Sequence, residues 1–403
     1  MHLCDEKVGA MVCCTERPYM IYSIPYVLLT VFLGLLALLH EKYKDDPSVP
    51  VNITAVGILM FFVFFGFRGF VFHDWTSYYV EFEEIDVYKL STYEFGNIKE
   101  HEPGWLLLSI LCKGIINNYH FFIFVITLAD VILFCRFLKR YTDNILLSMV
   151  IFLAFGGFAS MCNLLRNILA IMIFVNALPY LEKRKPIPYF LLCVLAFSFH
   201  YSSIFFFPLY FFLHRHTNKY VYLAIVIVCN IVFVLHVPIL LSLVKIFHVG
   251  GDFLERKIEV YTETTGSRGI GLGFLERLLT ALLIFCYYDK LTGARKSNCM
   301  FVNAFLLYLT TFSALSEFDE IAKRFSILYL FSYWILWPEI RKCFYFPNNR
   351  LLFNIFLGLY CVLKIVTTVN HVVMEYDNIL LGGIKSYQER KYIFSKEFQN
   401  PDE

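Results

Sequence analysis

The sequence predicts an all-α fold, a polytopic transmembrane helix bundle of about 10 to 12 spans with additional short re-entrant or broken helices. Of its 403 residues, 58% are hydrophobic and 17% are charged, whereas a soluble domain carries about 25% charged residues. Nearly uncharged runs cover 21–39, 51–67, 121–138 and 351–369, and roughly 20 such residues cross a hydrocarbon core. A membrane β-barrel would instead show short alternating segments, so helices are expected.

The placement of Lys and Arg predicts which loops face the cytoplasm. Clustered cations occur in the loops 41–50, 136–143, 182–188, 289–298 and 341–350. Cytoplasmic loops carry an excess of such cations, so the N-terminus is expected outside. The spans that fit this pattern are 20–39, 51–70, 120–138, 145–162, 164–181, 221–244, 273–288, 299–315, 325–340 and 351–372.

Two further apolar stretches fit this topology only if they return to the side on which they start. The stretch 104–116 has about 13 residues, a length typical of a re-entrant or interfacial segment. In 187–213, the polar residues at 198–203 and Pro208 are expected to break the helix. The alternative is one long tilted helix, which would place the basic loop 289–298 outside, against the charge rule.

The ends of the chain are polar compared with its centre. Residues 1–19 lack the apolar core of a signal peptide, so we expect a disordered leader, or a true start at Met20 rather than Met1. Residues 20–373 are expected to form a single transmembrane domain, and 374–403 a C-terminal tail. The 12 cysteines lack metal-ligand spacing and are interpreted as packing residues.

Ionisable residues at membrane depth are costly, so each is a functional candidate. Arg68 lies near the end of the second span and Asp74 follows it in FFGFRGFVFHDWTSYY. Arg68 could instead snorkel to the interface and pair with Asp74. Glu102 precedes Pro-Gly-Trp at the start of a short helix, where an acid also satisfies free backbone donors.

Two more candidates lie further along the chain. Arg166 opens the fifth span, where its planar guanidinium could bind phosphate oxygens or act as an ordinary end-of-span cation. His200 lies in FSFHYSS and could carry a proton or be a satisfied core residue. Arg268 and Arg324 are further cations of the outer loops, although Arg324 also follows an acidic run that could pair with it.

The predicted topology brings the main candidates to the same outer half of the bundle. Such a set suits a reaction on a lipid-linked diphosphate, in which cations stabilise the departing charge and a carboxylate or imidazole deprotonates an acceptor hydroxyl. These residues are Arg68, Asp74, Glu102, Arg166 and His200.

The chain resembles the EpsG family of Wzy-type polysaccharide polymerases over nearly its whole length. Four short elements carry the resemblance. They are an Arg before an Asp-aromatic-Tyr element, a Glu-x-Gly-aromatic element, an Arg that opens a span, and a Phe-His-x-Ser element. The matching residues are Arg68, Asp74, Tyr78, Glu102, Gly104, Trp105, Arg166, Phe199, His200 and Ser202. Where the family has Gly-Thr/Ser-Asp, this chain has Phe72-His73-Asp74.

The resemblance implies a GT-C-like fold and inverting glycosyl transfer without a metal or other cofactor. The donor would be a glycan on undecaprenyl diphosphate, and the acceptor a hydroxyl of an incoming lipid-linked repeat. The reaction would take place at the outer face of a bacterial cytoplasmic membrane, for capsule, exopolysaccharide or O-antigen. A chain-length regulator is an expected partner, and no nucleic acid is expected.

The same resemblance suggests roles for the candidate residues. The cations would hold the diphosphate, one of three groups would be the base, and two aromatic side chains would contact the substrate. The cations are Arg68, Arg166, Arg268 and Arg324; the candidate bases are His200, Glu102 and Asp74; the aromatic residues are Tyr78 and Trp105.

Three other functions remain open from the sequence. An O-antigen ligase-like transferase would use the same donor but usually carries one large outer loop, and the longest here is about 30 residues. A non-enzymatic flippase or transporter of lipid-linked sugar would show internal pseudo-symmetry and charges along a full path. A membrane acyltransferase would need a His-Asp-type pair near a cytoplasmic span end, and none is evident.

Overall fold

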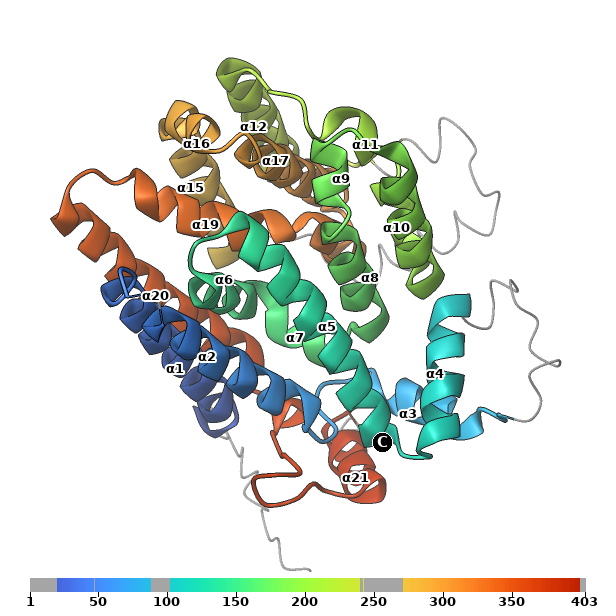
Figure 1. The fold of residues 1–403 in the computed structure, drawn as a ribbon. Helices are drawn as coiled ribbons and strands as arrows, with labels where there is room; N and C mark the ends of the chain where they lie inside the picture. Colours follow the sequence, from blue (N-terminus) through green and yellow to red (C-terminus); the bar gives the residue numbers. More distant parts are fainter. Residues whose placement is uncertain (1–19, 47, 88–101, 240–241, 243–270, 399–403) are drawn as a thin grey trace, which may run out of the picture.

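The computed structural model describes residues 20–46, 48–87, 102–239, 242 and 271–398. Its described part is helical and contains isolated β-bridges but no strand, so the predicted all-α fold is confirmed. The first half of the chain forms α1 (Ile24–Lys42), α2 (Val49–Gly66), α3 (Trp75–Glu84), α4 (Pro103–Ile115), α5 (Tyr119–Tyr141), α6 (Ile145–Phe152), α7 (Phe158–Cys162), α8 (Leu165–Val175), α9 (Leu178–Glu182) and α10 (Pro186–Phe199) (Figure 1). The second half forms α11 (Leu209–Phe212), α12 (Lys219–Val234), α15 (Leu272–Cys286), α16 (Tyr288–Ala294), α17 (Asn298–Ala314), α18 (Asp319–Ser326), α19 (Phe331–Cys343), α20 (Pro347–Val369) and α21 (Tyr387–Phe398).

The apolar runs fold into the expected long helices. Within the described residues, six helical stretches are long and apolar enough to span a membrane. These stretches are Ile21–Lys42, Val49–Gly66, Tyr119–Tyr141, Ile145–Cys162, Leu165–Glu182 and Pro347–Val369. The protein is therefore a multi-pass membrane protein.

The basic loops gather at one end of the bundle, which we call the basic end (41–46, 136–143, 182–186, 289–298 and 341–347). Ion pairs join loops that are far apart in the sequence. The pairs are Arg341 with Glu41 at 3.8 Å, Lys342 with Asp143 at 2.6 Å, Arg140 with Glu182 at 3.0 Å, and Arg295 with Asp143. This grouping agrees with the single-sided placement predicted from the charge pattern.

The stretch after α9 is a broken helix, as predicted. α10 ends at Phe199, and His200 has an extended backbone with φ −156° and ψ 122°. The chain then returns, so that the ring of Tyr210 lies 5.1 Å from that of Tyr189 near the start of α10. The Arg184 guanidinium, just before α10, also donates to the Tyr210 carbonyl. The alternative of one long tilted helix is therefore wrong.

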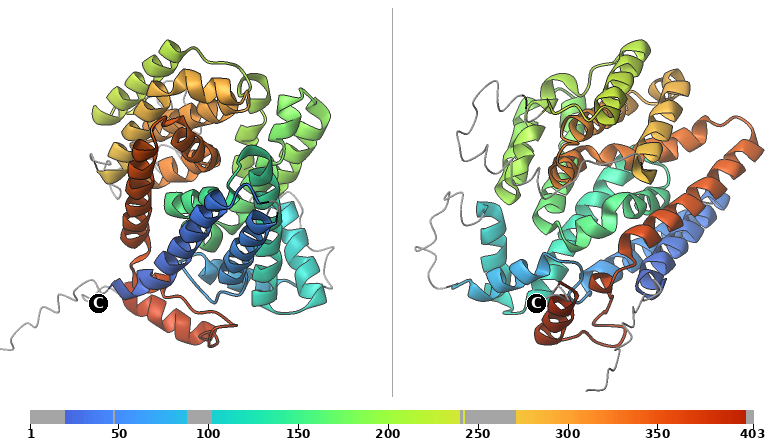
Figure 2. Two further views of the ribbon diagram at one scale, coloured as in Figure 1. Left: turned by 60° about the vertical axis from the view of Figure 1, so that its left-hand side comes forward. Right: turned by 180° about the vertical axis from the view of Figure 1, so that it is seen from behind.

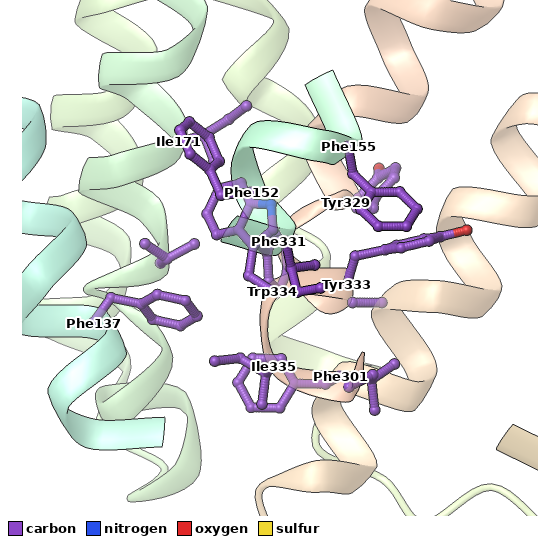
Figure 3. Packing of buried hydrophobic residues seen from close by; sticks show 14 of the residues in the cluster. Phe137, Phe152, Phe155, Ile171, Phe301, Tyr329, Phe331, Tyr333, Trp334 and Ile335 are labelled. Carbon is purple, nitrogen blue, oxygen red and sulfur yellow. The ribbon is translucent and has the colours of Figure 1, made fainter. Parts of the chain in front are cut away.

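Aromatic packing holds the centre of the bundle (Figure 3). The ring of Trp334 on α19 lies 5.0 Å from Phe152 on α6 and 5.2 Å from Phe134 on α5. Edge-to-face pairs of this kind contribute about 0.5–1.5 kcal/mol beyond their buried area. Nearly every side chain of α8 is also buried. Because α8 is packed on nearly all sides, a residue in its first turn has a well-fixed backbone position.

The segment that follows α20 packs on the loop between α2 and α3. Backbone N–H groups of Gly69 and Phe72 donate to the carbonyls of Asp377 at 3.1 Å and Val373 at 3.0 Å. A Cβ at position 69 would lie 2.0 Å from the Asp377 carboxylate, so a larger residue there would displace the Asp377 side chain. Figure 2 shows α21 beneath the bundle, at the end opposite the loop between α19 and α20. Much of the stretch predicted as a tail is therefore packed structure.

Arg390 anchors α21, and its loss is expected to destabilise the protein. The Arg390 side chain is buried, and it donates to the Phe70 carbonyl at 2.8 Å and to the Glu375 carboxylate at 2.6 Å. Arg390→Ala should lower the free energy of unfolding by about 2 kcal/mol, since a hydrogen bond to a charged group is worth about 1.5–3 kcal/mol. Thermal unfolding in detergent measures this, and the exposed neighbour Lys391→Ala is the matched control. Equal unfolding temperatures for both variants would refute the anchoring role.

Candidate functional site

Glu102 holds a cation and an imidazole at the same time. It precedes the first turn of α4, and its side chain is 6% exposed. Arg166 Nη1 donates to Glu102 Oε2 at 2.7 Å, and His200 Nδ1 lies 3.0 Å from Glu102 Oε1. We call these three residues the Glu102 cluster. Of the residues predicted to converge, the structure brings these three into direct contact.

Local sequence explains how each member is placed. Pro103 occupies the first position of α4, where its missing N–H costs nothing, so the helix begins immediately after Glu102. Arg166 lies in the first turn of the buried helix α8. His200 ends α10 in an extended conformation, and this directs its ring toward Glu102 rather than along the helix face. Three helix ends therefore meet at one carboxylate.

Gly104 permits the close approach of α4 to α10. A Cβ at this position would lie 2.4 Å from Ser198 Oγ and 2.9 Å from the Ser198 carbonyl oxygen. The second contact is with backbone, which cannot move aside as a side chain can. The glycine in the Glu-x-Gly-aromatic element is therefore required for Glu102 to reach His200.

The charges in the cluster fix its protonation pattern. Burial opposes ionisation of Glu102, but the hydrogen bond with His200 and the positive charge of Arg166 outweigh it and hold the pKa of Glu102 at about 2. Because the ionised carboxylate can only accept, His200 Nδ1 donates to it, and Nε2 of the neutral ring then carries the lone pair. Glu102 is therefore a poor proton acceptor in this arrangement.

The outer members of the cluster are also the accessible ones. The side chains of Arg166 and His200 are 28% and 29% exposed, compared with 6% for Glu102. Within the described residues, His200 Nε2 has no hydrogen-bond partner. The cluster thus offers a guanidinium and an imidazole nitrogen to an incoming molecule, above a buried carboxylate that orients both.

Asp74 lies near the cluster. Asn163 Oδ1 accepts from the backbone N–H groups of His73 at 3.1 Å and Asp74 at 2.7 Å, which fixes the loop before α3. Burial raises the pKa of Asp74, and the charges of Arg324 and Arg166 partly oppose that rise. Asp74 is therefore within electrostatic reach of two of the predicted cations. Arg324 itself is exposed on α18.

Phe72 adopts a backbone conformation that favours glycine. Its φ is 78°, in the left-handed region, where a Cβ is unfavourable. Its N–H donates to the Val373 carbonyl, and its carbonyl accepts from the Trp75 indole at 3.0 Å. This position is the first of the three at which the chain departs from the Gly-Thr/Ser-Asp element of the resembled family. A bulky residue therefore occupies a backbone conformation that favours glycine.

Tyr78 and Trp105 lie beneath the cluster. Both are buried, at 5% and 3% exposed, and their ring centroids are 5.4 Å apart. The guanidinium carbon of Arg166 lies 5.6 Å from the Tyr78 ring centroid, within the range of a cation–π contact. This placement favours a role in supporting Arg166 over direct contact with a large sugar substrate.

Arg68 lies apart from the Glu102 cluster. It is 3% exposed, and its guanidinium donates to the carbonyls of Phe65 and Met161 and, at 3.4 Å, to Thr127 Oγ1. Arg68 thereby joins α2, α5 and α7, and its donors are engaged within the protein. We therefore do not include it among the proposed diphosphate ligands. Arg268, another predicted ligand, lies outside the described residues.

Three buried ionisable residues were not among the candidates predicted from the sequence. Asp130 on α5 is 2% exposed and lies within electrostatic reach of Arg68. Glu276 accepts from Thr280 Oγ1 at 3.2 Å, and the guanidinium carbon of Arg277 lies 3.8 Å from the Phe312 ring centroid. Charged residues inside the apolar runs TLADVILF and FLERLLT are the signal that could have identified them. Among the described residues, no group of three His, Cys, Asp or Glu side chains is arranged to hold a metal ion.

Comparison with known proteins agrees with this architecture. The sequence model of the EpsG family matches residues 52–380, most of the chain and all three members of the Glu102 cluster. No curated protein and no solved structure matches the chain. The family implies a polysaccharide polymerase-like function in a membrane, with lipid-linked substrates. On this match, the protein belongs to the EpsG family.

Proposed function

We propose that the protein joins lipid-linked oligosaccharide repeats, transferring a glycan from undecaprenyl diphosphate to a sugar hydroxyl of an incoming repeat. The observation that carries this proposal is that the Glu102 carboxylate contacts both the Arg166 guanidinium, at 2.7 Å, and the His200 ring, at 3.0 Å. Glycosyl transfer from a diphosphate needs a cation for the leaving group and a base for the acceptor. The Glu102 cluster supplies both at neighbouring positions.

The chemical step follows from these positions. His200 Nε2 removes the proton from the acceptor hydroxyl as its oxygen attacks the anomeric carbon of the donor sugar. The bond between that carbon and the diphosphate oxygen breaks, and the diphosphate leaves with the electron pair. Arg166 balances the charge that develops on it, with Arg324 as a second cation, and attack opposite the leaving group inverts the anomeric centre. The scheme uses no metal ion.

Glu102 and Asp74 take supporting roles in this scheme. Glu102 fixes the ring orientation of His200 and stabilises the imidazolium that forms, as the carboxylate of a catalytic triad does. Asp74 lies within electrostatic reach of Arg166 and Arg324, and its half-buried carboxylate would help to hold these cations at the site. Of the three candidate bases, we favour His200, because Glu102 orients its ring and its Nε2 has no hydrogen-bond partner among the described residues.

The topology supports a reaction on the outer face of a bacterial cytoplasmic membrane. The segment Leu165–Glu182 begins beside Arg166 and ends at Glu182, which pairs with Arg140 at the basic end. The cluster and the basic end thus lie at opposite ends of a membrane-spanning stretch, and basic loops face the cytoplasm. The product would be capsule, exopolysaccharide or O-antigen, with a chain-length regulator as partner.

A reconstituted reaction tests this function. The purified full-length protein in proteoliposomes is incubated with synthetic lipid-linked repeats, and products are separated by size. A ladder of repeats is the expected result. A single transfer to another acceptor would favour the ligase-like alternative, and movement of the lipid without a new covalent bond would favour a flippase or transporter.

Gly104→Ala should impair this reaction without removing any charged group. The added Cβ would meet the Ser198 carbonyl at 2.9 Å, so α4 must shift from α10 and Glu102 from His200. A displacement of about 1 Å can cost roughly 10²-fold in rate. The rate of repeat addition in proteoliposomes measures the effect.

Gly114→Ala on the same helix is the matched control for this change. A Cβ there would lie 3.6 Å from the nearest atom, an ordinary contact distance. We expect this variant to keep the rate of the unmodified protein. Equal rates for the two alanine variants would contradict the close-approach requirement.

A further inference from the structure

A cavity of about 300 Å³ lies at the basic end, between α5 and the segment formed by α8 and α9. It is far larger than the space of one water molecule, about 30 Å³. Its lining includes Arg136, Arg140, Asn176, Tyr180 and Lys183. The proposed glycosyl transfer makes no use of it, since the Glu102 cluster lies toward the other end of these helices.

The cavity carries positive charge that is only partly neutralised by the residues that the structure describes. Arg140 pairs with Glu182 at 3.0 Å. Arg136 and Lys183 are exposed, and neither side chain forms an ion pair or hydrogen bond with any described residue. The Asn176 side chain, which follows α8, donates to the Leu133 carbonyl on α5 at 2.9 Å and so links the two helices. Two cations without a partner in the described part of the chain therefore line one concave space together with a polar side chain.

The side of α5 that carries Arg136 is apolar farther from the basic end. Leu128 and Ile132 precede Arg136 at intervals of four residues, which places all three on one side of the helix. Leu128 is 38% exposed and Ile132 is 57% exposed, within a helix long and apolar enough to span a membrane. This face is therefore suited to contact with lipid tails, and Arg136 follows it at the basic end of the helix.

We propose that this cavity binds the phosphate headgroup of an anionic phospholipid, with an acyl chain along Leu128 and Ile132. Basic pockets between transmembrane helices on the cytoplasmic side suit such headgroups. A free phosphate compound would gain the same charge contacts but would leave the apolar stripe of α5 unused. The bound lipid would tie α5 to the α8–α9 segment at the end opposite Arg166.

Native mass spectrometry of the full-length protein in detergent tests the site. Phosphatidylglycerol, phosphatidylcholine and inorganic phosphate are titrated separately. We expect phosphatidylglycerol to bind well above the other two. The double variant Arg136→Gln with Lys183→Gln should bind it roughly thirtyfold more weakly, from the usual contribution of each cation near a membrane surface.

A matched pair of charges provides the control. Lys139→Gln with Lys185→Gln removes two exposed cations of the same region that do not line the cavity, and this variant should bind the lipid normally. The exchange Arg136→Lys with Lys183→Arg preserves charge and should also retain binding. Equal loss in both double glutamine variants, equal binding of phosphatidylcholine, or phosphate binding as tight as the lipid's would each overturn the proposal.

Discussion

His200→Gln is expected to lower the rate of repeat addition by about 10²–10⁴-fold, the usual contribution of a positioned general base. Glutamine can still hydrogen-bond with Glu102, so the buried carboxylate keeps a partner. It has no basic nitrogen at the position of Nε2, and the acceptor hydroxyl must then attack the anomeric carbon without prior removal of its proton. The initial rate in proteoliposomes, normalised to the amount of inserted protein, measures the loss.

His216→Gln is the control for this experiment. His216 is exposed, and its ring lies 6.0 Å from Tyr288, near the basic end. Its replacement should leave the rate unchanged. A His200→Gln protein with at least a tenth of the normal rate would exclude His200 as the base and direct attention to Asp74.

Arg166→Ala has the second large effect, a loss of long-chain polymer with the transfer rate reduced by about 10²–10³-fold. The leaving diphosphate loses its nearest cation, and Glu102 loses the partner at 2.7 Å that balances its charge. Membrane insertion should be unaffected, because the apolar part of α8 is unchanged. Polymer length on gels and the amount of protein in the membrane fraction measure the two properties separately.

The charge-conserving Arg166→Lys variant refines this test. Lysine keeps the positive charge but loses the planar fork that contacts Glu102 and phosphate together. A partial recovery relative to Arg166→Ala is expected, together with a weaker apparent affinity for the donor lipid. Arg215→Ala, an exposed cation near the basic end, serves as the control. Polymer of normal length from Arg166→Ala would contradict the proposed role.

The features that the sequence predicted well are those with a local physical signature. The length of the apolar runs predicted the long helices, and the clustered cations predicted that the loops now seen to meet around Asp143 lie on one side of the membrane. The polar residues around His200 specified the break, because an extended backbone at that point interrupts an otherwise apolar helix. The predicted topology placed Glu102, Arg166 and His200 in the same outer half of the bundle, but their direct contact is known only from the structure.

The features that escaped prediction depend on long-range contacts. α2 ends at Gly66 instead of residue 70, so Arg68 follows the helix and turns inward to the Met161 carbonyl. No local pattern distinguishes this from an arginine that points outward. The packing of the C-terminal segment likewise depends on backbone hydrogen bonds, such as the one from the Phe72 N–H to the Val373 carbonyl. Backbone hydrogen bonds do not depend on side-chain type, so no sequence pattern predicts them.

The double variant Glu102→Gln with His200→Gln tests the central claim most directly. If Glu102 acts by holding His200 and Arg166 in place, the residues work as a unit and their effects are not additive. The rate of repeat addition in proteoliposomes should then be no lower for the double variant than for the more impaired single variant. A double variant whose loss of rate equals the product of the two single losses, or a Glu102→Gln protein with the normal rate, would contradict the claim that the Glu102 cluster works as a unit.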